Sequence, residues 1–189
     1  MLHDNCVSSI VFDYTGHGAS SPHGTIGRMK KDGEAAYAAL VAQFPNSRRC
    51  VMSFSMGAGP MLEAINRFSP APDCVIVTSA FSSLRDWTVS FAHAPRWSTY
   101  LFADLWNNVE NVKNVRSPIL VMHSRADHVN AFLMGEKIFV AAPEPKHFAA
   151  LDAFRHNDSY RSPGIGWWGP VIGFARFGMV EQNPPPSTQ

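Results

Sequence analysis

Short runs of apolar and β-branched residues recur along the chain, separated by longer stretches with helical periodicity. Four runs stand out: Val7–Tyr14, Cys50–Phe54, Cys74–Ser79 and Pro118–His123. Each is almost continuously apolar instead of alternating, which is typical of strands that are covered on both faces of a sheet. A fifth, weaker strand is expected over Lys146–Leu151.

Three stretches between and after these runs have the spacing of amphipathic helices. They are Arg28–Phe44, Met56–Phe68 and Ala131–Ala141, and prolines follow the last two. Prolines shortly after a periodic stretch are a helix stop signal. Because strands that alternate with helices form a parallel sheet with helices on both faces, the predicted fold class is α/β, a doubly wound and mostly parallel sheet.

Two stretches depart from this alternation. Phe81–Asn108 is rich in aromatic residues and follows a strand end, so it either caps or lines a pocket or packs as an ordinary helix on the sheet. Gly164–Val180 carries aromatic residues among glycines, and we expect a final helix docked on the sheet, the alternative being a contact surface for a partner or a membrane. We expect residues 1–180 to form one domain and residues 181–189, with three consecutive prolines, to be a disordered tail.

Composition narrows the class of protein. The chain has 189 residues, of which 46% are hydrophobic and 16% are charged, so disorder along most of its length is excluded. A net charge of +1 argues against a nucleic-acid binder, which needs a concentrated basic face. No apolar run is long enough for a transmembrane helix, and the first residues lack the pattern of a signal peptide.

The cysteines are sparse. Cys6, Cys50 and Cys74 lie far apart in the sequence and form no CxxC pair. An odd and scattered set of this kind predicts reduced thiols in a cytoplasmic protein and no disulfide framework.

The strongest signal for chemistry is Ser53-Phe54-Ser55-Met56-Gly57, at the junction of a predicted strand and a predicted helix. A serine hydroxyl attacks well only when it is exposed on a tight turn, with a base and backbone N–H groups close by. A strand–turn–helix elbow provides this arrangement, and the small side chains of Ser53 and Gly57 allow the turn to close. The alternative is a serine that simply caps the following helix.

An acidic residue and a histidine follow later strands in the order that this chemistry needs. Asp127 lies a few residues beyond the run Pro118–His123, and His156 follows the last predicted strand. The chain order Ser55, Asp127, His156 belongs to one triad architecture. In it the histidine takes the proton of the serine, and the carboxylate orients the imidazole and stabilises its charged form.

Other assignments of these side chains are weaker. His147 competes with His156 as the base but lies inside a predicted strand, and Asp152 and Asp158 are too close in sequence to His156 to orient it comfortably. A dinucleotide-binding loop after the first strand lacks its third glycine, and the eight histidines show no metal-binding spacing. We therefore expect neither a cofactor nor a metal.

In combination, these motifs resemble those of the α/β-hydrolase superfamily. The similarity is greatest to the branch of serine-aminopeptidase-like hydrolases and acyl-protein thioesterases (depalmitoylases). Asp13–Ser20 matches the turn Asp-Tyr-x-Gly-x-Gly-x-Ser, and Ser53–Gly57 matches Gly-x-Ser-x-Gly with serine for the first glycine. Ser117–Asp127 matches the strand and loop of the acid, with Ser124 in place of a glycine. His156-Asn157-Asp158 matches only the last part of the histidine motif.

The resemblance implies a serine hydrolase that cleaves an ester or a thioester. Ser55 would be the nucleophile, His156 the general base and acid, and Asp127 the orienting carboxylate. The Met56 backbone N–H would be an oxyanion donor. Two alternatives stay open, a serine peptidase and a catalytically impaired remnant or interaction module of the same fold.

The resemblance also implies an apolar wall beside the nucleophile. We expect Phe81, Trp87 and Phe91 to line a cleft above Ser55, because an acyl group needs apolar surroundings. The substrate would be a small molecule or an acylated protein, with neither a cofactor nor a nucleic-acid partner. Peripheral membrane contact and the oligomeric state stay open.

In the superfamily, further strands and an oxyanion loop precede the turn matched by Asp13–Ser20, and nothing between Met1 and Val7 corresponds to them. We favour an N-terminally truncated or mis-started chain, which would lack its second oxyanion donor and a membrane-associating segment. The alternative is that the strand Val7–Tyr14 pairs directly with Cys50–Phe54, an ordinary strand–helix–strand arrangement.

Overall fold

A parallel sheet forms the centre of the molecule. The computed structural model describes residues 2–21, 23–101, 103–158 and 164–179, so the expected tail, residues 181–189, lies outside the described part. In the described part the sheet has the order β1-β2-β3-β4, all parallel. The strands are β1 (Cys50–Phe54), β2 (Cys74–Thr78), β3 (Ile119–Ser124) and β4 (Lys146–Leu151). Four of the five expected strands are therefore confirmed.

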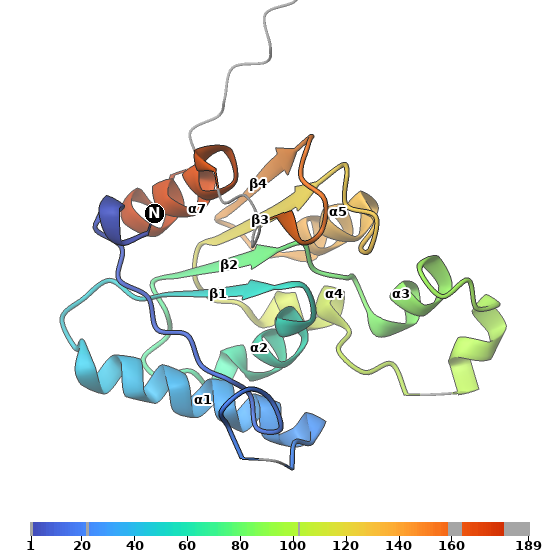
Figure 1. Cartoon of the computed structure of the whole chain (residues 1–189), viewed down its shortest axis with the longest axis horizontal. Coiled ribbons are helices and arrows are strands. Elements are labelled where there is room, and N and C mark those ends of the chain that lie inside the picture. Colours follow the sequence, from blue (N-terminus) through green and yellow to red (C-terminus); the bar gives the residue numbers. More distant parts are fainter. Residues whose placement is uncertain (1, 22, 102, 159–163, 180–189) are drawn as a thin grey trace, which may run out of the picture.

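Helices cover both faces of this sheet (Figure 1). Alternate strand residues, such as Val75 and Val121, contribute to a core with α1, α2, α4 and α5, while their neighbours Ile76 and Met122 pack with α7. The bounds of these helices are α1 Ile26–Gln43, α2 Ala58–Ala64, α4 Asn108–Asn111, α5 Phe132–Ala141 and α7 Ile165–Phe177. The α/β class and the docking of the final helix on the sheet are confirmed.

Short 3-10 helices also occur in the described part of the chain. The helix expected after Ser55 is divided into η2 (Ser55–Gly57), α2 and η3 (Ile65–Arg67). Two others are η1 (His3–Asn5) and η5 (Val112–Asn114). No described helix combines the length and the apolar character that crossing a bilayer would need.

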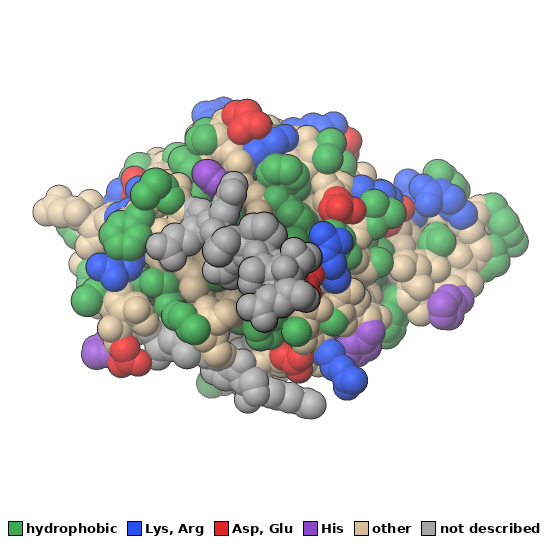
Figure 2. Space-filling model, turned by 90° about the horizontal axis from the view of Figure 1, so that it is seen from above, with side chains coloured by type: hydrophobic (Ala, Val, Ile, Leu, Met, Phe, Trp, Pro, Cys, Tyr) green, Lys and Arg blue, Asp and Glu red, His purple; other side chains and the backbone are tan. Residues whose placement is uncertain are grey.

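The aromatic stretch after β2 forms a projection that we call the cap. It consists of α3 (Leu84–Ser90) and η4 (Arg96–Leu101) and extends to the right of the sheet in Figure 1. Its base is anchored by Asn108, whose side-chain amide donates to the Phe81 carbonyl oxygen at 2.8 Å. Hydrophobic side chains lie beside basic and histidine side chains at this projecting end (Figure 2).

The strand expected over Val7–Tyr14 is absent. This segment has no regular structure and does not pair with β1, so the prediction and the alternative built on it were wrong. Its apolar side chains are largely exposed, and Val11 retains 89% of its accessible surface. An apolar run indicates side chains suited to burial, but a strand also needs a neighbour that accepts its backbone hydrogen bonds.

The prediction of three reduced thiols was wrong for two of them. Cys50 and Cys74 form a disulfide, whereas Cys6 is free and exposed. Their positions, 24 residues apart in sequence, come together because β1 and β2 pair in a register that sets Cys50 directly beside Cys74. Nothing in the residue pattern specifies that register.

Candidate active site

The sheet delivers Ser55 to the edge where all four strands end. Ser55 follows β1 without an intervening residue and has a φ of 51°, in the left-handed region that serine rarely adopts. A sharp, strained strand-to-helix turn of this kind presents a serine hydroxyl outward. Gly59, a little further along, meets Trp106, and an added Cβ there would lie 2.8 Å from the Trp106 Cβ. The glycine therefore lets this tryptophan pack close to the elbow.

Asp127 lies in the loop after β3, and its carboxylate is fully buried. One oxygen, Oδ1, accepts hydrogen bonds from the backbone N–H groups of Val129 and Asn130, both at 2.9 Å. Burial alone would raise the pKa of the Asp127 carboxyl. The hydrogen bonds from His156 and from these two N–H groups outweigh that effect and lower the pKa below its usual range. The side chain is thus held as a carboxylate.

His156 lies in the loop after β4, where the Arg155 N–H donates to the Asp158 carboxylate at 2.6 Å. The imidazole connects the other two side chains. Its Nδ1 is 2.7 Å from Asp127 Oδ2, and its Nε2 is 2.8 Å from the Ser55 hydroxyl oxygen. The Asp127 carboxylate can only accept a hydrogen bond, so the proton of the neutral imidazole lies on Nδ1. Nε2 is therefore free to accept a hydrogen bond from the Ser55 hydroxyl. A proton can move from the serine to the imidazole along this path.

A second group of polar residues is connected to Asp127 through Asn130. The side-chain amide of Asn130 donates to the Ser79 carbonyl oxygen at 2.7 Å, where β2 has just ended. His123 Nε2 is 2.9 Å from the Asn130 carbonyl oxygen, so this nitrogen carries the proton. Sequence reasoning assigned no role to Asn130, and its distance from Ser79, 51 positions away, left no local signal.

The competing acids and base lie elsewhere. His147 packs edge-on against Phe174 of α7, and Asp152 is 3.3 Å from Arg125 at the surface. Asp158 accepts from its own turn, as described above. In the Asp13–Ser20 turn, Asp13 accepts a hydrogen bond from the Ala19 N–H at 3.0 Å.

The three aromatic residues expected near Ser55 occupy different surroundings. Phe81 is buried in a cluster that also contains Met29, Trp106 and Met134. Trp87 packs partly buried against this cluster and stacks on Phe91, with ring centroids 4.9 Å apart. Phe91 itself is exposed. Trp87 thus contacts both surroundings, and a cleft that the three residues line above Ser55 stays a prediction.

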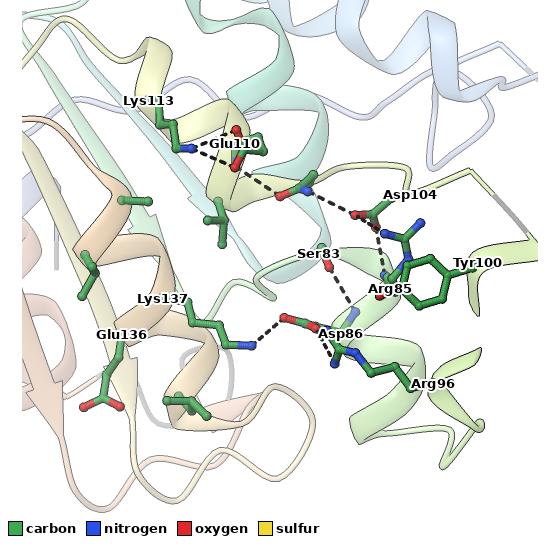
Figure 3. A pocket seen from close by; sticks show the side chains of 15 residues that line it. Ser83, Arg85, Asp86, Arg96, Tyr100, Asp104, Glu110, Lys113, Glu136 and Lys137 are labelled. Carbon is green, nitrogen blue, oxygen red and sulfur yellow. Dashed lines mark hydrogen bonds and ion pairs between the residues drawn. The ribbon is translucent and has the colours of Figure 1, made fainter. Parts of the chain in front are cut away.

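A cavity lies between the cap and the helices α4 and α5 (Figure 3). Its volume is about 790 Å³, and side chains of both signs line it. Arg85 pairs with Asp104 at 3.6 Å, and Lys113 pairs with Glu110 at 2.8 Å. A smaller cavity of about 390 Å³ lies against the Asp13–Ser20 turn. Within the described ranges, Ser55 lines neither of these two cavities.

Solved structures share this architecture. The esterase domain of a Rhodothermus marinus protein superposes with a TM-score of 0.61 and 22% identity, over 87% of this chain and 72% of that one. The Pyrococcus furiosus esterase Pf2001 superposes with a TM-score of 0.65 and 19% identity, over 86% and 66% of the two chains. The fold is therefore the α/β-hydrolase fold.

Sequence relatives agree with this class. The human α/β-hydrolase domain-containing protein 17B is 30% identical over 149 residues, 78% of this chain and 49% of that protein. The lysophosphatidylserine lipase ABHD12 of Macaca fascicularis is 23% identical over 181 residues, 82% and 46% of the two chains. No family model matches the sequence. The chain spans about half the length of these relatives, and its similarity to them is consistent with the α/β-hydrolase superfamily.

Proposed function

We propose that the chain is a serine hydrolase that cleaves an ester or a thioester by acyl transfer. The observation that carries this proposal is the unbroken series of hydrogen bonds from Asp127 through His156 to Ser55. A serine attacks only when a base in contact with it takes its proton, and the base acts best when a third group orients it. The names of the relatives, which include a lipase and several esterases, support the same class of reaction.

The proposed reaction has two halves. The Ser55 oxygen attacks the carbonyl carbon of the substrate while its proton passes to His156 Nε2, which gives a tetrahedral oxyanion. The oxyanion collapses, the bond to the alcohol or thiol breaks, and the leaving group takes the proton from His156. Water then attacks the acyl group on Ser55 with His156 again as the base, releasing a carboxylic acid and the free serine.

Two further groups stabilise the charges that form during the reaction. Asp127 holds the tautomer of His156 in which Nε2 is free and stabilises the imidazolium that forms during attack. The Met56 N–H follows the nucleophile, the position from which one oxyanion donor comes in this fold. Loss of one such donor lowers the turnover of a serine protease by about 10²–10³-fold, so the position of the Met56 N–H strongly affects the rate.

We propose that Phe81, Trp87 and Phe91 belong to the apolar side of the substrate site. Phe81 follows β2 by three residues, on the sheet edge where Ser55 lies. Its buried cluster with Trp106 lies close to the elbow, because Trp106 contacts Gly59, and the partly buried Trp87 and the exposed Phe91 provide the accessible apolar surface beside that cluster. An acyl chain is the kind of group that such a surface accommodates. The acyl-protein thioesterases that the motifs resemble make a protein thioester one candidate substrate.

Turnover of a short activated ester tests this function. We expect the purified chain to hydrolyse it and Ser55→Ala to remove the activity. The matched control is Ser53→Gly, which changes a serine two positions away and should keep the activity. Equal activity of Ser55→Ala and the unaltered chain would overturn the proposal. A thioester and an amide with the same acyl group, assayed in parallel, distinguish a thioesterase from a peptidase.

A folded chain without Ser55-dependent turnover would favour the alternative, an impaired remnant or an interaction module. The two serines at family glycine positions, Ser53 and Ser124, suggested this alternative from the sequence. In the structure, the Ser53 hydroxyl is buried and makes no hydrogen bond within the described residues. The surroundings of Ser124 are different.

A further inference from the structure

Ser124 lies where the loops that carry Asp127 and His156 leave the sheet. It is the last residue of β3 and is buried, with 3% of its surface accessible. Its hydroxyl oxygen accepts two backbone hydrogen bonds, from the Ala126 N–H at 3.2 Å and from the Phe154 N–H at 3.1 Å. Ala126 immediately precedes Asp127, and Phe154 lies two positions before His156. One side-chain oxygen therefore contacts both loops.

This contact extends the pairing of β3 with β4. The last ladder hydrogen bond between the two regions runs from the Arg125 N–H to the Leu151 carbonyl oxygen at 2.7 Å. Beyond this hydrogen bond, the segments that follow β3 and β4 separate into their loops. The Ser124 hydroxyl spans the separation at Phe154, where backbone pairing has ended. A hydroxyl oxygen has two lone pairs, so it can accept both N–H groups at once.

Glycine, the residue that the family motif has at this position, could not make this contact. Without the hydroxyl, the N–H groups of Ala126 and Phe154 would lose their common acceptor. Both hydrogen bonds are only partly buried, so their loss costs the modest free energy of ordinary hydrogen bonds, and the two N–H groups would then find separate partners. The acid loop would still be held on its other side, because Asn130 donates to the Ser79 carbonyl oxygen at 2.7 Å. The histidine loop would lose this backbone tie to the acid loop, and the Arg125–Asp152 ion pair and the His156–Asp127 contact would be left to set the distance between the loops.

We propose that Ser124 is a positioning residue that sets the distance between Asp127 and His156. The inference rests on the proposed function, because it concerns the geometry of the same site. Ser124 acts through the backbone of the two loops and does not touch the reacting atoms. The serine at this position is thus a substitute for the family glycine that adds a tie, and it is not a sign of a decayed site.

Kinetics of two variants test the proposal. Ser124→Ala and Ser124→Gly both remove the hydroxyl and should lower kcat about ten- to a hundredfold with KM changed less than about twofold, because small misplacements of reacting groups have costs of this size. The control is Ser117→Ala, a buried serine just before the opposite end of β3, whose hydroxyl donates to the Pro72 carbonyl oxygen. It should leave both constants unchanged. Circular dichroism at the assay temperature verifies that the variants are folded.

A spectroscopic measurement keeps the test independent of turnover. The His156 Nδ1 proton, in a 2.7 Å contact with Asp127, should give a downfield proton resonance in the unaltered chain and in Ser117→Ala. In Ser124→Ala this resonance should broaden or shift upfield. An unchanged resonance, or a kcat within twofold of the Ser117→Ala value, would overturn the proposal. Failure of the proposed function would instead abolish Ser55-dependent turnover in every protein while the resonance still responded to Ser124→Ala.

Discussion

At the scale of single residues, a fully buried histidine contacts the loop that carries Asp127. His123 lies in β3, and its side chain has no accessible surface. Gly135 of α5 makes room for it, because an added Cβ would lie 2.8 Å from the His123 Cβ. In the sequence, His123 is only the last residue of an apolar run. The identity of the contacts could not be predicted, since Gly135 is on a different element.

The protonation of His123 should affect stability in mild acid. Burial lowers its pKa, an effect that exceeds the opposing influence of the hydrogen bond to Asn130 and of the Asp127 charge. The unfolded chain, with an ordinary histidine pKa of about 6.5, therefore binds a proton that the folded chain excludes. We expect the free energy of unfolding to fall as the pH drops below about 6.5 and to recover above it.

The comparison with His123→Gln isolates this effect. Glutamine can place an amide near the position of Nε2 but does not titrate. We expect urea unfolding between pH 5 and pH 7.5 to show that the free energy of unfolding falls more steeply in acid for the unaltered chain than for the variant. The difference between the two free energies should change by at most about 1.4 kcal/mol per pH unit. Parallel curves for the two proteins would contradict the buried neutral histidine.

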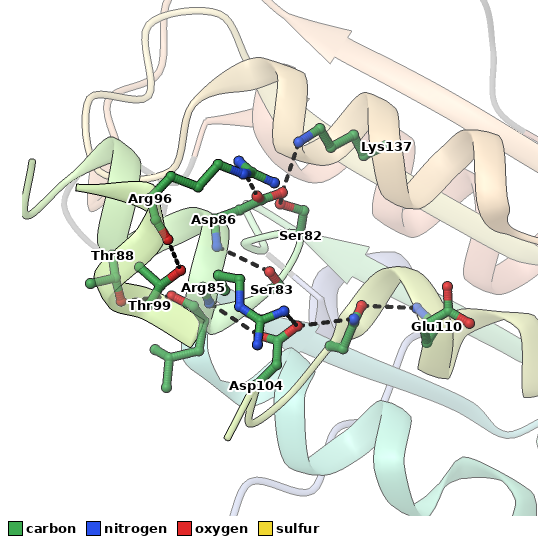
Figure 4. Close-up of polar contacts among 12 residues, drawn as sticks. Ser82, Ser83, Arg85, Asp86, Thr88, Arg96, Thr99, Asp104, Glu110 and Lys137 are labelled. Carbon is green, nitrogen blue, oxygen red and sulfur yellow. Dashed lines mark hydrogen bonds and ion pairs between the residues drawn. The ribbon is translucent and has the colours of Figure 1, made fainter. Parts of the chain in front are cut away.

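At the scale of elements, one carboxylate fastens the cap to the rest of the molecule. Asp86 of α3 accepts hydrogen bonds from Lys137 of α5 at 2.7 Å and from Ser82 at 2.8 Å, and Arg96 of η4 is 3.5 Å away (Figure 4). Burial raises the pKa of Asp86, but the hydrogen bonds from Lys137 and Ser82 and the nearby positive charges lower it overall. The carboxylate therefore stays charged at neutral pH and keeps its ion pair with Lys137. We call this ion pair between Asp86 and Lys137 the latch.

Loss of this latch should loosen the cap alone. In Lys137→Met, we expect amide hydrogen exchange over residues 84–101 to accelerate about two- to fivefold, because a partly exposed ion pair contributes about 0.5–1 kcal/mol. The sheet should exchange as before. Lys113→Met is the matched control, since its ion pair with Glu110 joins α4 only to the adjoining η5 and does not involve the cap. Equal acceleration in the two variants would contradict the latch.

The elements show which parts of the fold the residue pattern can predict. The predicted runs Cys50–Phe54 and Lys146–Leu151 match the bounds of β1 and β4, whereas β2 ends one residue before its predicted run and β3 is shifted by one residue from its own. Val7–Tyr14 has the same pattern and is not a strand. A single run cannot tell whether a neighbouring strand is available, so pairing is predictable only from the whole sheet.

The same limit applies to the candidate site. The order and spacing of Ser55, Asp127 and His156 indicated that all three follow strands, and parallel strands end at one edge. The ties at Ser124 and Asn130 depend on how two loops approach each other over 30 and 51 positions. Such contacts follow from tertiary packing, which leaves no periodic signal in the sequence.

At the scale of the whole molecule, the disulfide joins the strand that precedes Ser55 to its neighbour. Cys50 and Cys74 lie at the start of β1 and β2, at the end of the sheet opposite the candidate site. A cross-link that closes a loop of about this length restricts the unfolded chain and stabilises the fold by about 3 kcal/mol. It therefore bears on stability more than on chemistry.

Removal of the disulfide tests that account. We expect the double variant with Cys50→Ser and Cys74→Ser to unfold in urea with a free energy about 3 kcal/mol lower than that of the unaltered chain. The control Cys6→Ser changes the free, exposed cysteine and should have no such effect. If a reducing agent left the unaltered chain as stable as before, the contribution of the cross-link would be disproved.

Covalent labelling with a fluorophosphonate tests whether Ser55 is an activated nucleophile. The reagent bonds to a serine whose hydroxyl is activated by a neighbouring base, and peptide mass spectrometry locates the adduct. We expect one adduct, on Ser55, that is lost in His156→Ala and kept in Ser53→Gly. A folded, unlabelled Ser55, or equal labelling of Ser55 without His156, would contradict it.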